Sequence, residues 1–147
     1  MSPLEPSEIK IKELISLFDK KKFDELLKLS NELLENFPKS ILVHNIQGVV
    51  HTELKNYKLA KNLFIKIVNL SPNYTDGHYN LANVYNKLDE KEKAIESYNK
   101  VIELDINYFK AHNNLGNIYR KKGLNKRATE CYLSTLEINS NYKVAYY

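Results

Sequence analysis

Apolar residues recur three or four positions apart through much of this chain, which is the spacing of one face of an α-helix. One segment shows this pattern at Tyr79, Leu81, Ala82, Tyr85 and Leu88. The next shows it at Ala94, Ile95, Tyr98, Val101 and Ile102. No segment alternates apolar and polar residues as a half-buried strand would. The pattern therefore predicts an all-α protein in which pairs of helices flank short turns.

The helical pattern repeats every 34 residues. Aligning 41–74, 75–108 and 109–142 brings like residues into register, and each unit ends in an Asn-Tyr pair. The eighth position of each unit holds a small residue, namely Gly48, Ala82 and Gly116. The twentieth holds an alanine, namely Ala60, Ala94 and Ala128, and the twenty-fourth holds an aromatic ring, namely Phe64, Tyr98 and Tyr132. Antiparallel helices approach closely only at small residues, and the space beside them must be filled. We therefore expect rings packed beside the small sites.

The segments HYNLANVYNKLDEKEKAIESYNKVIELDINY and HNNLGNIYRKKGLNKRATECYLSTLEINSNY resemble tetratricopeptide repeats, a helix–turn–helix family with a 34-residue period. The resemblance covers residues 41–142. It departs from the family where His44, His78 and His112 stand in place of the usual Trp. The resemblance implies a right-handed superhelical solenoid of antiparallel helix pairs, with the first helix of each pair on the concave wall.

The two ends of the chain are less regular. Leu14, Leu26 and Ser30 stand at the small, alanine and aromatic sites of a degenerate first unit, which we interpret as an N-terminal cap. The last five residues reproduce the opening of another first helix, so we expect a truncated chain or a partner that continues the stack. Self-association there would bury Val144, Tyr146 and Tyr147. The predicted organisation is a cap, three repeats and the start of a fourth: 7–40, 41–74, 75–108, 109–142 and 143–147.

Composition narrows the class of protein. Hydrophobic residues make up 43% and charged residues 27%, which is ordinary for a globular domain. No apolar run approaches the ~20 residues that cross a bilayer, and acidic residues occur where a secretory signal would be basic and apolar. We expect a cytoplasmic protein with no membrane partner. The net charge of +4 comes from scattered lysines, with Arg120 and Arg127 the only arginines, so we expect no nucleic-acid partner.

The sequence shows no catalytic or metal-binding constellation. Cys131 is the single cysteine, and His44, His78 and His112 recur at the repeat period, so they fall on separate layers and cannot share one ion. The four glycines are isolated and form no phosphate-binding loop. We predict neither an enzyme nor a bound cofactor or metal.

The concave wall that the resemblance implies is rich in asparagine. An amide offers both a donor and an acceptor, so such a wall suits the backbone of an extended peptide. Asn80 and Asn114 share the sixth position and resemble the asparagine ladder of O-linked N-acetylglucosamine transferase, although Ile46 interrupts it. Lys110, Arg120 and Lys121 make the C-terminal half of the groove positively charged, which favours acidic partners. The candidate groove residues are Asn45, Tyr79, Asn80, Asn83, Asn86, Lys110, Asn113, Asn114, Asn117, Arg120 and Lys121.

The asparagines also have an alternative origin in genome composition, because an AT-rich genome would enrich asparagine, lysine, isoleucine and tyrosine throughout the chain. The carboxylate clamp of chaperone-binding repeats fits poorly, because Asn45, Val49 and Asn114 replace residues that the clamp requires. We therefore predict a protein-interaction scaffold or adaptor that binds an extended protein or peptide segment. The alternative is the N-terminal repeat region of a larger enzyme of glycosyltransferase or sulfotransferase type.

Overall fold

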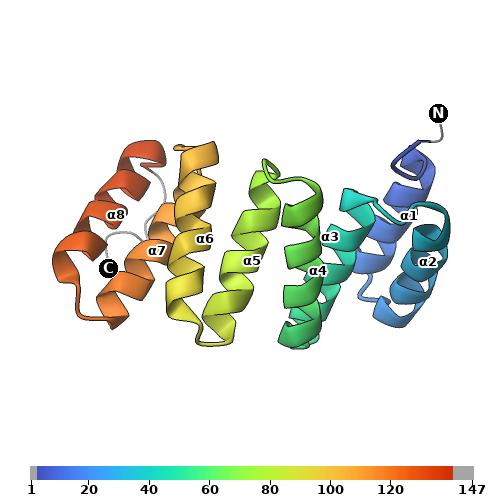
Figure 1. The fold of residues 1–147 in the computed structure, drawn as a ribbon, viewed down its shortest axis with the longest axis horizontal. Coiled ribbons are helices and arrows are strands. Elements are labelled where there is room, and N and C mark those ends of the chain that lie inside the picture. The colour runs from blue at the N-terminus through green and yellow to red at the C-terminus, as the bar shows by residue number, and fades with distance from the viewer. Residues whose placement is uncertain (1–2, 141–147) are drawn as a thin grey trace. The chain divides into compact units, whose positions relative to one another are not determined.

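The computed structural model describes residues 3–140, and within that range the chain forms eight α-helices and no strand (Figure 1). The helices are α1 (Glu8–Asp19), α2 (Phe23–Asn36), α3 (Ile41–Glu53), α4 (Tyr57–Leu70), α5 (Thr75–Lys87), α6 (Lys91–Leu104), α7 (Phe109–Lys121) and α8 (Asn125–Ile138). The predicted all-α fold of repeated helix pairs is confirmed. The predicted fourth unit at 143–147, with the self-association assigned to it, lies outside the described residues, and the predicted unit boundaries stay a prediction.

The chain divides into two compact units, and the boundary falls between Gly77 and His78, inside the first turn of α5. Each unit has its own apolar core, as expected of a fold in which every helix pair packs on its neighbours. All but one of the candidate groove residues belong to the second unit. The exception is Asn45 on α3.

The core of the first unit is built around the leucines of α1 and α2. Leu14 and Leu26 are fully buried and pack with Leu33, Val43 and Val50. At the aromatic site of the degenerate repeat, the buried Ser30 hydroxyl accepts a hydrogen bond of 2.8 Å from Nε2 of Gln47. In the same unit a Cβ at Gly48 would lie only 2.5 Å from the Phe64 ring, which explains the small residue at that site.

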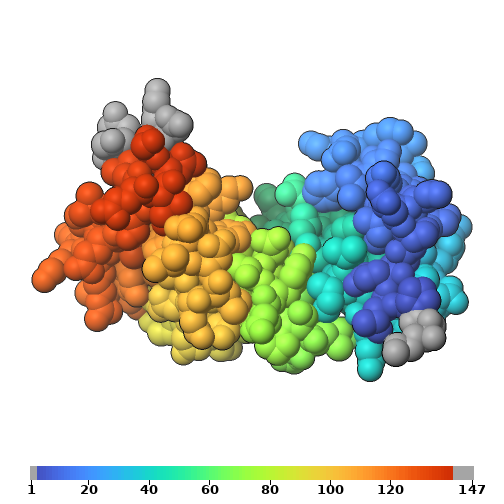
Figure 2. Space-filling view, turned by 90° about the horizontal axis from the view of Figure 1, so that it is seen from above, coloured from blue at the N-terminus to red at the C-terminus, as the bar shows by residue number. Residues whose placement is uncertain are grey.

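The core of the second unit is centred on Tyr98, whose side chain is fully buried. It packs with small and branched residues of α5, α6 and α7, namely Ala82, Ala94, Val101, Ala111, Leu115 and Ile118. A Cβ at Gly116 would lie 2.8 Å from the Tyr132 ring, so the small site again faces a ring. The space-filling view shows α8, coloured red, beside the orange α7 on which it packs (Figure 2).

The turns that follow α1, α3, α5 and α7 share one backbone conformation. Lys21, Lys55, Asp89 and Gly123 are spaced by the repeat period and have φ of 56°, 60°, 60° and 77°. Only glycine adopts this left-handed region without steric cost. Three of the four turns therefore hold a mildly strained residue.

The start of α3 is fixed by two oxygen-bearing side chains. The Ser40 hydroxyl oxygen accepts from the Val43 amide at 3.1 Å, which is an N-cap bond. The Glu5 carboxylate accepts from the Ile41 amide at 2.9 Å and from the Ser40 hydroxyl. A carboxylate at a helix N-terminus satisfies free amides and complements the helix dipole. Glu5 thus ties the chain before α1 to α3 within the first unit.

Candidate functional site

Most of the candidate residues lie on one side of α5 and one side of α7. In α7 they recur at the spacing of a single helical face, at Lys110, Asn113, Asn114, Asn117, Arg120 and Lys121. In α5 the same spacing gives Tyr79, Asn80, Asn83 and Asn86. Hydrogen bonds between Asn114 and α5 join the two sets. We refer to these ten residues as the α5–α7 face.

A polar network lies at the centre of the α5–α7 face. The Tyr98 hydroxyl, from α6, donates to Oδ1 of Asn83. Nδ2 of Asn114 lies 3.2 Å from the same oxygen and 3.3 Å from the hydroxyl oxygens of both Tyr79 and Tyr98. Three helices thus converge on four side chains. These amides are held by the chain itself, so only their remaining donors and acceptors can serve a partner.

The same contact recurs in the next repeat. The Tyr132 hydroxyl, from α8, donates to Oδ1 of Asn117 at 2.6 Å, and the two residues are 15 positions apart, as are Asn83 and Tyr98. At the corresponding positions of the first unit the chain has Val49 and Phe64, which carry neither amide nor hydroxyl. In the three regular units 41–74, 75–108 and 109–142, the amide and the phenolic hydroxyl are therefore present together or absent together.

The two hydroxyls that donate to asparagine, those of Tyr98 and Tyr132, are held in the neutral form. Burial raises the pKa of Tyr98, and burial also raises the pKa of Tyr132. The Tyr79 ring lies against those of Tyr98 and Tyr108, with centroids 6.1 Å and 4.9 Å apart. Packed rings of this kind leave the hydroxyls little freedom to turn away from their acceptors.

The other members of the α5–α7 face differ in accessibility. Lys110, Arg120 and Lys121 are exposed, and Asn86 is half-buried. Asn80 and Arg120 each have a further interaction within the chain. Asn113 is only 3% exposed, and its Oδ1 is buried without a hydrogen-bond partner. Asn113 is therefore not available to a partner, whereas the exposed Lys110 and Lys121 are.

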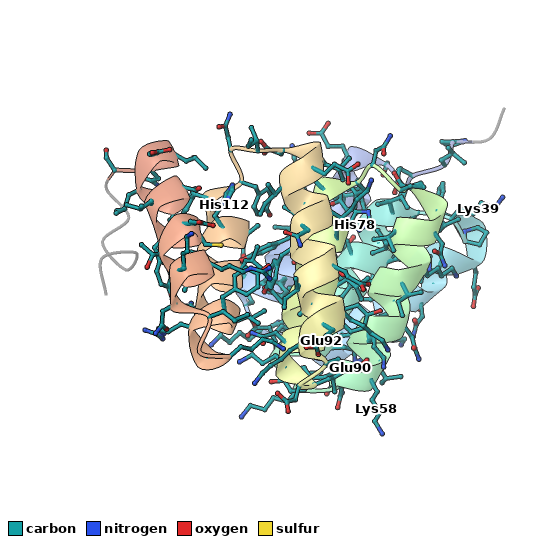
Figure 3. All side chains as sticks on the ribbon, turned by 60° about the vertical axis from the view of Figure 1, so that its left-hand side comes forward. Lys39, Lys58, His78, Glu90, Glu92 and His112 are labelled. Atoms are coloured by element: carbon teal, nitrogen blue, oxygen red, sulfur yellow. The ribbon has the colours of Figure 1, made fainter. Side chains whose placement is uncertain are left out.

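Charge is distributed unevenly between the helices of the second unit. From His78 onward, α5 and α7 carry Lys87, Lys110, Arg120 and Lys121 and no carboxylate. The carboxylates of α6 and α8 are matched by equal numbers of cations on the same helices. Figure 3 labels Glu90 and Glu92 at the turn that opens α6. Glu92 pairs with Lys122, and that hydrogen bond lowers the pKa of Glu92.

The first unit has a different surface at the same repeat positions. Ile46 and Val49 of α3 line a hollow of about 120 Å³ with Ile15 and Phe18 of α1, and Asn45 lies at its edge. Such a hollow suits an apolar side chain. It was not predicted from the sequence, although the apolar residues at the sixth and ninth positions of 41–74 were the available signal.

Comparison with known proteins shows to which family this repeated helical fold belongs. A family model described as a tetratricopeptide repeat matches residues 43–74 and 109–142, and a related model described as a TPR repeat matches residues 83–123. Together the two models cover most of the chain. The chain belongs to the tetratricopeptide repeat family. Repeats of this family form surfaces for protein–protein interaction.

Two kinds of relative share the tetratricopeptide repeats. A curated protein, the Hsp70-Hsp90 organising protein of Plasmodium falciparum (isolate 3D7), is 31% identical over 88 residues, which is 55% of this chain but only 16% of that protein. The crystal structure of MamA superposes with a TM-score of 0.84 at 24% identity, covering 95% of this chain and 81% of that one. MamA 41-end from Desulfovibrio magneticus RS-1 gives 0.82 at 24% identity, over 90% and 75%. The structural likeness concerns the fold.

His44 and His112 of the tetratricopeptide repeats each bond to a nearby backbone carbonyl oxygen. Nδ1 of His44 lies 2.7 Å from the Ser40 carbonyl oxygen, and Nε2 of His112, a residue labelled in Figure 3, lies 2.9 Å from that of Ile106. Residues 3–140 contain no group of three His, Cys, Asp or Glu side chains that could hold a metal ion.

Burial raises the pKa of Cys131 to about 11, so its thiol is a poor nucleophile near neutral pH.

None of the helices between residues 3 and 140 combines the length and the apolar character needed to span a bilayer.

Proposed function

We propose that this chain is a cytoplasmic, non-catalytic adaptor whose α5–α7 face binds an extended segment of a partner protein. The observation that carries the proposal is the uneven charge of α5 and α7, which present amides and four cations against a single carboxylate, Asp76 in the first turn of α5. A surface of this kind attracts a partner of opposite charge and pairs with its backbone. The family's use in protein–protein interaction supports the same conclusion. The lone cysteine fits a reducing compartment.

The likeness to the Hsp70-Hsp90 organising protein does not define the partner. The matched segment covers 16% of that protein, and most of the length of that protein has no counterpart in this chain. The proposal therefore rests on the chemistry of the α5–α7 face. The same surface would serve equally in a repeat region attached to a catalytic domain.

The experiment compares two variants of equal charge. Lys110→Gln with Lys121→Gln removes two exposed cations from α7, and Lys100→Gln with Lys126→Gln removes two from α6 and α8. The partner captured by the wild-type chain is identified, and its affinity for each variant is measured by calorimetry. We expect the α7 variant to lose about fivefold or more in affinity, and the matched variant to stay within about twofold of wild type.

Equal affinity of both variants for the captured partner would contradict the proposal, and so would equal losses. Thermal unfolding of both variants is recorded alongside, because Lys110, Lys121 and Lys126 are exposed but Lys100 is half-buried and pairs with Glu103, and any change in stability is then measured separately from affinity.

A further inference from the structure

The hydrogen bonds of the second unit fix which way its amides face. Oδ1 of Asn83 accepts hydrogen bonds from the Tyr98 hydroxyl and from Nδ2 of Asn114. Oδ1 of Asn117 accepts one from the Tyr132 hydroxyl at 2.6 Å. A reversed Asn83 amide would set its own N–H groups against the Asn114 donor. The acceptor of each amide is thus turned toward the protein.

The donors of the same two amides are left for solvent. Within the described chain, Nδ2 of Asn83 and Nδ2 of Asn117 form no hydrogen bond, and neither atom is buried without a partner. The Asn114 amide has the opposite orientation. Its Nδ2 donates to the network of Tyr79, Asn83 and Tyr98, so its Oδ1 is the atom left to accept a hydrogen bond from a partner. The face therefore offers donors from two repeats and an acceptor beside them. An extended peptide offers carbonyl oxygens and N–H groups in alternation, which complements this arrangement.

The pairing of amide and hydroxyl follows the repeats. Where Phe64 replaces the tyrosine, Val49 replaces the asparagine, and no donor is presented from the ninth position. A fully buried ring such as that of Tyr98 has no need of a hydroxyl for packing, since Phe64 is buried to the same degree without one. The Tyr98 hydroxyl is therefore explained by its hydrogen bond to the Asn83 amide, which fixes the orientation of that amide.

We propose that Tyr98 and Tyr132 are positioning residues that hold the Asn83 and Asn117 amides with their N–H groups outward, and that the segment bound there is an extended peptide bearing acidic side chains. This rests on the proposed function and names the chemistry of its partner. The acidic character follows from the four cations of α5 and α7, which exceed the single carboxylate of these helices, Asp76 in the first turn of α5.

The test uses the whole chain and three fluorescein-labelled dodecapeptides that alternate glycine with glutamate, glutamine or lysine. Fluorescence anisotropy should show the glutamate peptide binding about tenfold or more tightly than the glutamine peptide, and the lysine peptide binding least. Equal binding of the glutamate and glutamine peptides would overturn the acidic partner. So would tighter binding of an oligouridylate of the same length, which would indicate a nucleic-acid surface.

The positioning role is tested with Tyr98→Phe and Tyr132→Phe. Each should weaken binding of the glutamate peptide about fivefold, because a hydrogen bond that fixes a side chain is worth about that factor in an equilibrium constant. The control is Tyr119→Phe on α7, whose hydroxyl has no hydrogen bond in the described chain and whose ring contact with Arg127 survives the change. It should bind as wild type does.

A mutant cycle separates positioning from general stability. In an Asn83→Ala background, Tyr98→Phe should lower affinity clearly less than it does in the wild type, since the Asn83 amide is gone and only the contact of the hydroxyl with Nδ2 of Asn114 remains. The same loss in both backgrounds would overturn the positioning role. Tyr132 is only half-buried, so Tyr132→Phe with Asn117→Ala provides a second cycle if the Tyr98 variant folds poorly.

The proposed surface and the positioning role fail in different ways. If the lysine variants of α7 retain full affinity for the captured partner, the proposed surface is wrong. If they lose affinity while both tyrosine variants bind the glutamate peptide as wild type does, only the positioning role is wrong.

Discussion

Tyr98 and Asn83 stand 15 residues apart on α6 and α5, and the tyrosine hydroxyl donates its hydrogen bond to the asparagine oxygen. Tyr132 and Asn117 repeat the contact on α8 and α7. In the first of these pairs the contact joins the core to the first helix of the repeat, because the Tyr98 ring is fully buried while the Asn83 amide is half-buried; in the second pair both side chains are half-buried. An amide that would be mobile at a free surface is thereby held in one orientation.

The tyrosine–asparagine pair can be introduced at the equivalent positions of the first unit by substitution. Phe64→Tyr alone would bury a hydroxyl without an acceptor beside Val49 and should lower the free energy of unfolding by about 1–3 kcal/mol. Adding Val49→Asn supplies the acceptor and should recover about 1 kcal/mol of that loss. Urea unfolding of the two single variants and the double variant gives the coupling energy. A coupling energy of zero would show that the hydroxyl and the amide do not form a unit.

The left-handed turns predict stabilising substitutions. Lys55→Gly should raise the free energy of unfolding by about 0.5–1 kcal/mol, because glycine adopts a φ of 60° without the steric cost that lysine incurs. Gly123→Lys should lower it by about 1 kcal/mol for the same reason. Lys58→Gly, in the first turn of α4, is the control and should destabilise the chain. A loss of stability in Lys55→Gly would contradict the assigned turn.

Asn113 and Asn117 should respond oppositely to an apolar replacement. The Asn113 oxygen is buried and unpartnered, so Asn113→Leu removes an unsatisfied group and should leave stability unchanged or raise it by about 1 kcal/mol. Asn117→Leu deprives the Tyr132 hydroxyl of its acceptor and should cost about 1–2 kcal/mol. Both free energies come from urea titrations. A larger cost at Asn113 than at Asn117 would show that the buried amide is satisfied by a group such as an ordered water.

His44 predicts a loss of stability in mild acid. Burial lowers its pKa below the ordinary 6.5, an effect that the Ser40 carbonyl and Glu5 oppose and that Lys66 reinforces. Above pH 6.5 the ring is neutral in both states and the stability is complete. As the pH falls below that value the unfolded chain takes up a proton that the folded chain resists, so the free energy of unfolding decreases.

The measurement for His44 is the midpoint of thermal unfolding between neutral pH and about pH 5.5. The midpoint should fall over this range in the wild type and fall less in His44→Gln. His51, whose pKa burial also lowers, accounts for part of the remainder. An identical pH dependence in wild type and His44→Gln would contradict the role of this histidine.

The fold could be predicted because its causes are periodic and steric. Gly48 must be small because of the Phe64 ring, and Gly116 because of the Tyr132 ring, and both relationships recur at a fixed spacing that the sequence displays. The left-handed turns at Lys21, Lys55 and Asp89 carry no glycine of their own, and the one signal for them was Gly123 at the same position of the third repeat. Packing of the helices on either side imposes that conformation on residues that do not favour it.

The candidate surface could be predicted in position but not in detail. Helical spacing placed Asn83, Asn114 and Asn117 on the first helices, as the structure does. The orientation of their amides depends on hydroxyls from other helices, and the burial of Asn113 depends on how closely its neighbours pack. Neither follows from the spacing of residues along one helix. The change from Val49 and Phe64 to asparagine and tyrosine was visible in the aligned repeats, but it takes on meaning only when the contact is seen.

The most direct test of the proposed α5–α7 face is a ¹H–¹⁵N NMR titration of the chain with the glutamate–glycine dodecapeptide, following the side-chain amides of asparagine. We predict that the Nδ2 resonances of Asn83 and Asn117 shift most, together with backbone amides of α5 and α7, and that those of Asn99 on α6 stay in place. Shifts confined to α6 and α8, with the Asn83 and Asn117 amides unchanged at saturation, would contradict this prediction.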